Sequence, residues 1–171
     1  MNLSECLLTD SDLSGANLAG VNFNGAICDQ VDFSEANLKG CLLINASCKT
    51  ADFSQANING ANFSGADLRC ACFNKASIKN SNFTQAKLDR AAFNFADCED
   101  AVFNGATLPF SDFSHSLVIN ADFSGADLKQ ARLHRVDDRR TNWKGCNKST
   151  AEYTDKNLAE AEDWLPPLPP N

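Results

Sequence analysis

The chain has 171 residues, a formal net charge of −7 at neutral pH and 43% hydrophobic residues. Leu, Ile and Val are outnumbered by Ala, Asn, Asp, Ser and Gly, a balance that is unusual for a layered globular core. No run approaches the roughly eighteen apolar residues of a membrane span, and residues 1–5 lack the basic start and apolar stretch of a signal peptide. We therefore expect a soluble, cytoplasmic protein without a membrane partner.

Residues 1–145 consist of a five-residue repeat. A small residue, most often Ala, recurs at every fifth position, and Leu or Phe follows two residues later, as in residues 51–55 (ADFSQ), 61–65 (ANFSG) and 121–125 (ADFSG). Counted in fives from Met1, the segment holds 29 units without an insertion or deletion. Such a repeat indicates a stacked architecture, in which each unit buries its apolar face against its neighbours.

The pattern resembles the pentapeptide-repeat family over about 85% of the chain. The resemblance implies an all-β fold: a right-handed quadrilateral β-helix, a solenoid in which four units form one square coil of twenty residues and about seven coils stack. Gly, Asn and Ser at the corner positions suit the tight turns between walls.

Residues twenty apart in the sequence carry similar side chains, as stacked coils require. Two columns are mostly aromatic: Leu3, Phe23, Leu43, Phe63, Phe83, Phe103, Phe123 and Trp143, and, ten residues away, Leu13, Phe33, Phe53, Phe73, Phe93, Phe113 and Leu133. The other two columns carry Leu, Ile, Val or Cys. Large columns on opposite walls, with the small residue of each unit beside them, would fill a narrow bore.

Eight cysteines occur along the chain. Six occupy inward positions of the repeat and are expected to pack as reduced core residues. Cys70 and Cys72 fall on outward or corner positions, where a C-x-C pair could bind metal or respond to oxidation. No histidine or second cysteine pair lies nearby at ligand spacing, so we expect neither metal nor cofactor, and a switch at Cys70 and Cys72 stays as an alternative.

Several apolar residues of the fifth and sixth coils fall on outward or corner positions, which a solenoid normally fills with polar residues. The candidates for partner binding are Phe95, Val102, Phe110, Leu117 and Ile119, with Pro109 beside them. Either these residues form a docking or dimerisation band, or a local distortion of the coil or the returning C-terminal segment covers them.

Candidate catalytic residues are few. His115 and His134, the only histidines, fall on outward positions nineteen residues apart, on the same wall of neighbouring coils. A solvated wall does not provide the sheltered pocket that catalysis needs. The vertical file of Asp12, Asp32 and Asp52 is a feature of the repeat and is expected to bond its turns. We therefore expect no enzymatic activity.

Charge is distributed unevenly along the chain. Residues 1–128 carry 15 acidic and 7 basic side chains, residues 129–148 have a net charge of +5, and residues 149–171 have −4. The acidic shaft thus ends in a candidate basic end patch, which consists of Arg132, Arg135, Arg139 and Arg140. We expect no direct binding of nucleic acid.

Residues 146–165 leave the repeat and are predicted to form a C-terminal cap. Residues 149–152 (STAE) have the form of a capping box, and Asp155 to Leu165 could form a short α-helix over the open end. The side chains expected to face inward are Leu158, Ala161, Trp164 and Leu165. Residues 166–171 are Pro-rich and should be extended, as a flexible end or as a polyproline ligand or linker.

The sequence thus predicts a non-enzymatic protein-binding scaffold or adaptor that presents the walls of a rigid rod to a protein partner, or to a second copy through a solenoid end or the apolar band. The family resemblance implies an alternative. Members that protect DNA gyrase are similar rods, thought to imitate duplex DNA in shape and negative potential and to modulate quinolone sensitivity. The nearly neutral wall around Asn62, Asn82 and Ser124 makes the charge match weaker than the shape match.

Overall fold

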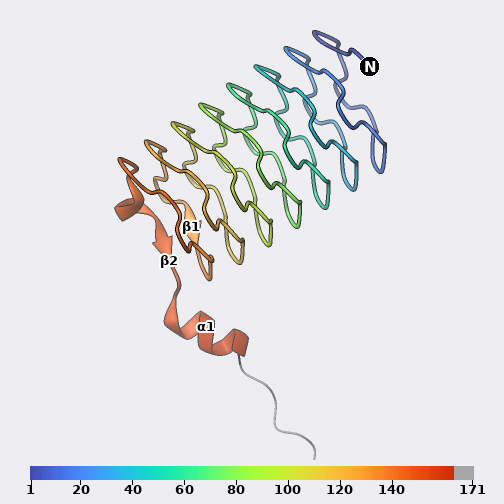
Figure 1. Ribbon diagram of the computed structural model, residues 1–171. Helices are drawn as coiled ribbons and strands as arrows, with labels where there is room; N and C mark the ends of the chain where they lie inside the picture. The colour runs from blue at the N-terminus through green and yellow to red at the C-terminus, as the bar shows by residue number, and fades with distance from the viewer. Residues whose placement is uncertain (164–171) are drawn as a thin grey trace, which may run out of the picture.

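Residues 1–163 are described by a computed structural model, in which the chain winds into a stack of square coils with a short C-terminal extension (Figure 1). Single parallel β-bridges join residues twenty positions apart, and one column runs without a break from Asn2 to Asn142. Counting each coil from 1 to 20, we call its four walls A (1–5), B (6–10), C (11–15) and D (16–20). The fold is a β-helix, as the family resemblance implied.

The fifth residue of every unit forms a corner between two walls. From Glu5 to Gly145 each corner residue has a positive φ, between 50° and 73°. Residues with a β-carbon adopt this left-handed conformation at a cost of roughly 1–2 kcal/mol, which Asn offsets in part by local hydrogen bonding. Gly occupies nine of the corners, so bulky residues at other corners, Phe95 and Phe110 among them, hold a disfavoured backbone conformation.

The second residue of many units bonds the turn that follows it. Asp32 Oδ1 accepts a hydrogen bond of 2.8 Å from the amide of Ser34. Asp12, Asp52 and Asp112, in the same column as Asp32, accept the equivalent bond from the residue two positions later. Asp12, Asp32 and Asp52 are joined by β-bridges in one file of wall C. The predicted structural role of these carboxylates is confirmed.

The third residue of each unit fills the bore. Phe33 and Phe53 stack with ring centroids 5.0 Å apart and planes 8° from parallel. Rings on walls A and C also meet edge to face, as Phe53 and Phe63 do at 5.7 Å. The aromatic side chains from Phe23 to Phe123 in these columns are fully buried, so the predicted interior is confirmed.

The inward positions also hold the buried cysteines. Cys28, Cys41, Cys48 and Cys98 are buried in the shaft, and burial raises the pKa of the Cys41 and Cys98 thiols. The thiols of Cys41 and Cys98 are therefore protonated, and all four cysteines are core residues, as their positions in the repeat predicted.

The C-terminal segment contains the few elements longer than a bridge. They are strand β1 (Arg132–Leu133), a 3-10 turn η1 (Lys148–Thr150), strand β2 (Glu152–Tyr153) and helix α1 (Lys156–Asp163). Strand β2 pairs in parallel with β1, with Arg132 opposite Glu152. Because this spacing is again twenty residues, the coil register continues past residue 145, where the sequence suggested that the repeat ended.

The predicted capping box is not formed. Residues 148–150 make the 3-10 turn and Glu152 lies in β2, because the chain still follows the coil register here and Glu152 pairs with Arg132 on wall C. Asp155 caps α1 instead, and its Oδ1 accepts hydrogen bonds from the amides of Asn157 and Leu158 at 2.8 and 2.9 Å.

Helix α1 does not close the bore. Leu158, expected to face inward, is 49% exposed, and Ala161 is exposed as well; the helix lies to one side of the last coil (Figure 1). Trp143 ends the aromatic column by stacking on Phe123 at 4.7 Å, and Lys148 Nζ lies 4.2 Å from the centre of its ring. The predictions for Trp164, Leu165 and residues 166–171 fall outside the described residues. Within residues 1–163, no helix is long and apolar enough to cross a membrane.

Candidate functional site

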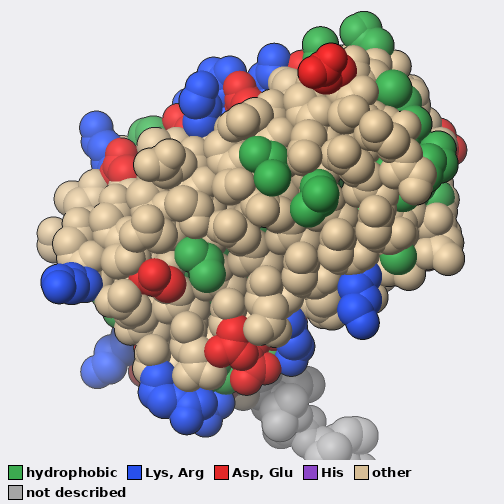
Figure 2. All heavy atoms as spheres, turned by 45° about the horizontal axis from the view of Figure 1, so that its top comes forward, with side chains coloured by type: hydrophobic (Ala, Val, Ile, Leu, Met, Phe, Trp, Pro, Cys, Tyr) green, Lys and Arg blue, Asp and Glu red, His purple; other side chains and the backbone are tan. Residues whose placement is uncertain are grey.

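The outer walls are dominated by uncharged polar side chains. Figure 2 shows one face on which charged side chains are scattered and lie mostly toward the edges. Along wall A the bridged column contains Asn22, Leu42, Asn62, Asn82 and Val102 before the first acidic residue, Asp122. This surface is rigid and neutral rather than uniformly acidic.

The structure does not bring the five apolar candidates into one band. Val102 lies on wall A between Asn82 and Asp122, and Leu117 lies on wall D between Asp97 and Asp137. Ile119 shares wall D with Leu117 by its position in the coil. Phe95 and Phe110 lie instead at the two corners that bound wall C. The walls therefore divide the candidates into separate groups.

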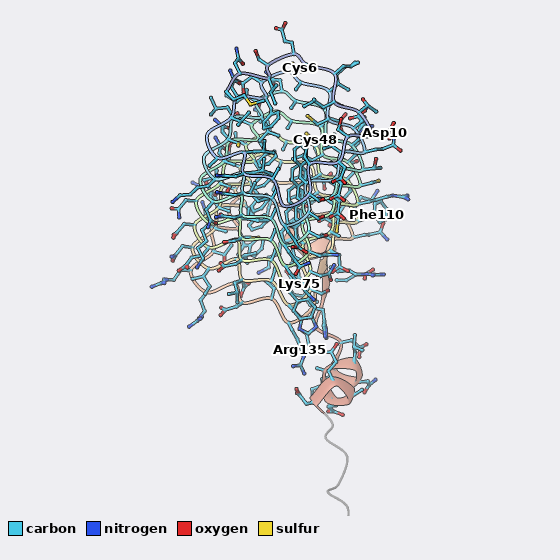
Figure 3. All side chains as sticks on the ribbon, turned by 90° about the vertical axis from the view of Figure 1, so that its right-hand side faces the viewer. Cys6, Asp10, Cys48, Lys75, Phe110 and Arg135 are labelled. Atoms are coloured by element: carbon cyan, nitrogen blue, oxygen red, sulfur yellow. The ribbon has the colours of Figure 1, made fainter. Side chains whose placement is uncertain are left out.

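Phe95 and Phe110 are the most exposed of these residues, at 57% and 48%. The guanidinium carbon of Arg90, one coil below Phe110, lies 5.6 Å from the centre of the Phe110 ring, and the Phe95 ring stacks on His115 at 4.7 Å. Figure 3 shows Phe110 on the outside of the shaft and Cys48 within it. We call the part of wall C between these two corners the Phe95–Phe110 face.

The Phe95–Phe110 face continues into a groove of about 350 Å³ beneath the C-terminal segment. Its walls come from three sources, namely wall C, strand β2 and helix α1. The lining residues are Asn94, Phe95, Asp112, Ser114, His115, Arg132, His134, Glu152, Tyr153, Asp155, Leu158 and Glu162. The C-terminal segment thus borders the apolar candidate Phe95 without covering it.

The two histidines lie together, as the sequence allowed, but not on a solvated wall. Their ring centroids are 5.3 Å apart, and His134 is only 8% exposed, because α1 folds back over wall C. Glu162 of α1 lies between them, with Oε2 at 3.2 Å from His134 Nε2 and Oε1 at 3.6 Å from His115 Nε2. The expectation of a solvent-facing pair is therefore wrong.

Three of the four arginines of the basic end patch are paired with acids. Arg132 Nη1 lies 3.7 Å from Asp112 Oδ2, and Arg132 Nε lies 3.6 Å from Glu152 Oε2. Arg139 Nη2 donates a hydrogen bond of 2.7 Å to Asp137 Oδ2, and this bond lowers the pKa of the Asp137 carboxyl. Arg139 and Arg140 line a hollow of about 550 Å³ on wall D with Glu99 and Ile119.

Arg135 is the arginine that fastens the helix. Its Nε lies 3.0 Å from Glu162 Oε2 and its Nη2 lies 2.7 Å from Asp163 Oδ2, and it also donates a hydrogen bond of 2.6 Å to the carbonyl of Ala159. Figure 3 places Arg135 at the end of the shaft nearest α1. The basic residues serve largely to hold acidic groups of the same chain.

Cys70 and Cys72 do not form a ligand cluster. Cys70 is an exposed corner residue, and Cys72 Sγ lies 3.1 Å from Ser54 Oγ on wall C. Within residues 1–163, the cluster of three potential metal ligands is His115, His134 and Glu162. The repeat gave no sign of Glu162, Tyr153 or Leu158 as site residues, because their positions depend on a non-repetitive segment turning back.

Comparison with known proteins agrees with the fold. The pentapeptide repeat region model matches residues 6–83, and the model for pentapeptide repeats in eight copies matches 81–118 and 110–137. No curated protein sequence matches the chain.

Two structures of QnrB1, described as a plasmid-mediated fluoroquinolone resistance protein, are similar to the chain. A trypsin-treated variant has 19% identity, a TM-score of 0.69 and coverage of 94% of this chain and 87% of its own. Full-length QnrB1 has 20% identity, a TM-score of 0.64 and coverage of 91% and 85%. At this identity the likeness concerns the fold alone.

A pentapeptide repeat protein from the Arabidopsis thaliana thylakoid lumen has 30% identity over 60% of this chain and 68% of its own, with a TM-score of 0.48. The two family models together span residues 6–137, and the fold is similar to that of QnrB1. The chain belongs to the pentapeptide-repeat proteins, which form right-handed β-helices.

Proposed function

We propose that the protein is a non-enzymatic protein-binding scaffold and that its partner binds on the Phe95–Phe110 face. One observation carries this proposal: two bulky, exposed phenylalanines occupy left-handed corners, with φ of 59° at both. The fold requires the left-handed conformation at every corner but not a bulky aromatic side chain there, and a disfavoured residue at a strained position is a pointer to function.

Corner chemistry elsewhere in the rod strengthens the argument. Gly or a polar residue occupies every other corner from Glu5 to Gly145 apart from Cys70, so the turn itself does not need an aromatic side chain. Exposed aromatic residues are enriched where proteins bind one another. Arg90 and His115, stacked on the two rings, hold them in place and reduce the entropy lost on binding.

The interior of the rod suits a scaffold as well. The bore is filled by buried side chains from Leu18 to Leu133, and each coil is hydrogen-bonded to its neighbours through the backbone. Such a stack presents its walls as fixed surfaces, and binding to it requires little rearrangement.

The test compares a double variant with a matched control. Phe95→Asn with Phe110→Asn removes both rings while retaining a residue that tolerates the corner. Gln55→Asn with Thr50→Asn places the same residue at the equivalent corners, two coils from Phe95 and three coils from Phe110. The tagged chains are expressed in the source cell, cross-linked and purified, and the enriched partner is then titrated with purified protein.

We expect the double variant to bind the partner about tenfold or more weakly than the wild type, in line with the loss of interface hot spots, and the control to bind normally. Equal binding by the double variant, or equal loss in the control, would refute the assignment of this face. A second copy of the chain as the enriched partner would correspond to the predicted homodimer.

The alternative function, a DNA mimic that binds a type II topoisomerase, is favoured by the similarity of the fold to QnrB1 and by the acidic file on wall C. The neutral column on wall A and the use of the Asp carboxylates within turns count against it. A DNA supercoiling assay separates the two proposals.

A further inference from the structure

We propose that His115, His134 and Glu162 form a binding site for one divalent transition-metal ion of the zinc class, which fastens helix α1 to wall C. The proposal stands independently of the partner-binding role of the Phe95–Phe110 face.

The donor atoms are spaced as metal ligands. Two imidazole Nε2 atoms and the Glu162 carboxylate lie within 4.8 Å of one another, with contacts of 3.2 Å from His134 and 3.6 Å from His115 to separate carboxylate oxygens. A tetrahedral ion with bonds of about 2.0–2.1 Å separates its ligands by roughly 3.4 Å. Small side-chain movements would bring all three donors to one ion.

Both rings are held in place before any ion binds. His134 is 8% exposed, and Nε2 is the ring nitrogen with a polar neighbour, since Nδ1 is buried without a hydrogen-bond partner among the described residues. His115 is packed between Phe95 and His134. Preorganised imidazoles lose little freedom when they coordinate an ion.

The charge around the site favours a cation. Asp112, Glu152 and Asp155 line the same groove as Glu162, whereas Arg132 and Arg135 supply the positive charge. The hydrogen bond with His134 lowers the pKa of Glu162, so its carboxylate is charged at neutral pH and ready to act as a ligand.

Arg135 is the competitor for Glu162, at 3.0 Å from Oε2. It has two other partners, because Asp163 lies 2.7 Å from Nη2 and the Ala159 carbonyl accepts a bond of 2.6 Å. Arg135 can therefore stay on α1 while Glu162 turns to the ion. The three ligands supply two nitrogens and one oxygen, and the groove leaves the fourth position open to water, as in zinc sites with three protein ligands.

The test titrates the purified full chain with Zn²⁺ by calorimetry and with Co²⁺ by visible absorption, under reducing conditions. We expect one saturable equivalent and a tetrahedral Co²⁺ spectrum without thiolate charge-transfer bands. The chain has only two histidines, so the imidazole NMR signals of both should shift in step with the titration.

Variants assign the ligands. His115→Gln, His134→Gln and Glu162→Gln should each weaken Zn²⁺ binding at least about tenfold, given that even the outer partners of metal ligands contribute 10–100-fold. Glu160→Gln, which removes a carboxylate from the same helix without removing a ligand or a partner of Arg135, and Cys70→Ser with Cys72→Ser should bind normally. Absence of saturable binding, unshifted histidine signals, or loss of binding only in the cysteine variant would each overturn the proposal.

Discussion

Phe110 and Phe113 lie three residues apart and have opposite surroundings. Phe113 stacks on Phe93 at 4.4 Å and is fully buried, whereas Phe110 projects from a left-handed corner and is 48% exposed. The position within the five-residue unit, not the residue type, decides which of them contributes to stability. Stability and partner binding can therefore be separated by single substitutions.

We predict that Phe113→Ala lowers the free energy of unfolding by about 3–5 kcal/mol, because it leaves a cavity in the aromatic column. Phe110→Asn should change it by less than about 1 kcal/mol, since the relief of corner strain offsets the lost contact with Arg90. Urea unfolding followed by circular dichroism measures both. A large loss in the Phe110 variant would mean that this ring stabilises the fold and would remove the strain argument for a binding role.

The C-terminal segment illustrates how one element can follow the coil and then leave it. Strand β2 keeps the twenty-residue register against β1, and α1 then lies against wall C through polar contacts made by Arg135, His134 and Glu162. No residue of α1 is buried. Docking of the helix therefore depends on charge and hydrogen bonds rather than on apolar packing.

We predict that α1 is released from wall C at acid pH. The pKa values of Glu162 and Asp163 are lowered by hydrogen bonds with His134 and Arg135 respectively. A carboxyl with a lowered folded-state pKa contributes stability above its unfolded-state value, near 4.5 for Glu, and that contribution is lost as the pH falls through the folded-state value. Below about pH 4.5, amide hydrogen exchange in residues 156–163 should accelerate before exchange in the coils.

The matched comparison for the acid release is Glu162→Gln, which cannot titrate at this position. Its helix should exchange faster at neutral pH and show a smaller change on acidification. Protection of residues 156–163 that persists unchanged to pH 3 would show that other contacts hold the helix.

At the scale of the whole molecule, the shaft could be predicted from the sequence and the C-terminal site could not. Every stacked pair, such as Phe33 with Phe53, follows from a period of twenty. The burial of His134 and the role of Glu162 do not, because they depend on a segment without periodicity returning to an earlier wall. The predicted capping box was wrong because Glu152 remained in register with Arg132.

The charge of the whole rod leads to a prediction about the alternative function. We expect the purified chain to leave DNA supercoiling by gyrase unchanged, with or without a quinolone. Wall A carries a neutral column from Asn2 to Val102, and basic residues on the other walls of the shaft interrupt the negative potential there. QnrB1 serves as the comparison protein. Inhibition of gyrase, or protection from the quinolone, at comparable concentrations would instead support DNA mimicry.

The unbroken period of twenty residues also constrains how such a chain can change in length. Loss or gain of a single residue would rotate every later side chain to a different position of the unit and expose phenylalanines to water. A change of twenty residues would leave each column aligned and alter the rod by one step of about 4.8 Å. The distance between the N-terminal end of the shaft and the Phe95–Phe110 face can thus change only in steps of one whole coil.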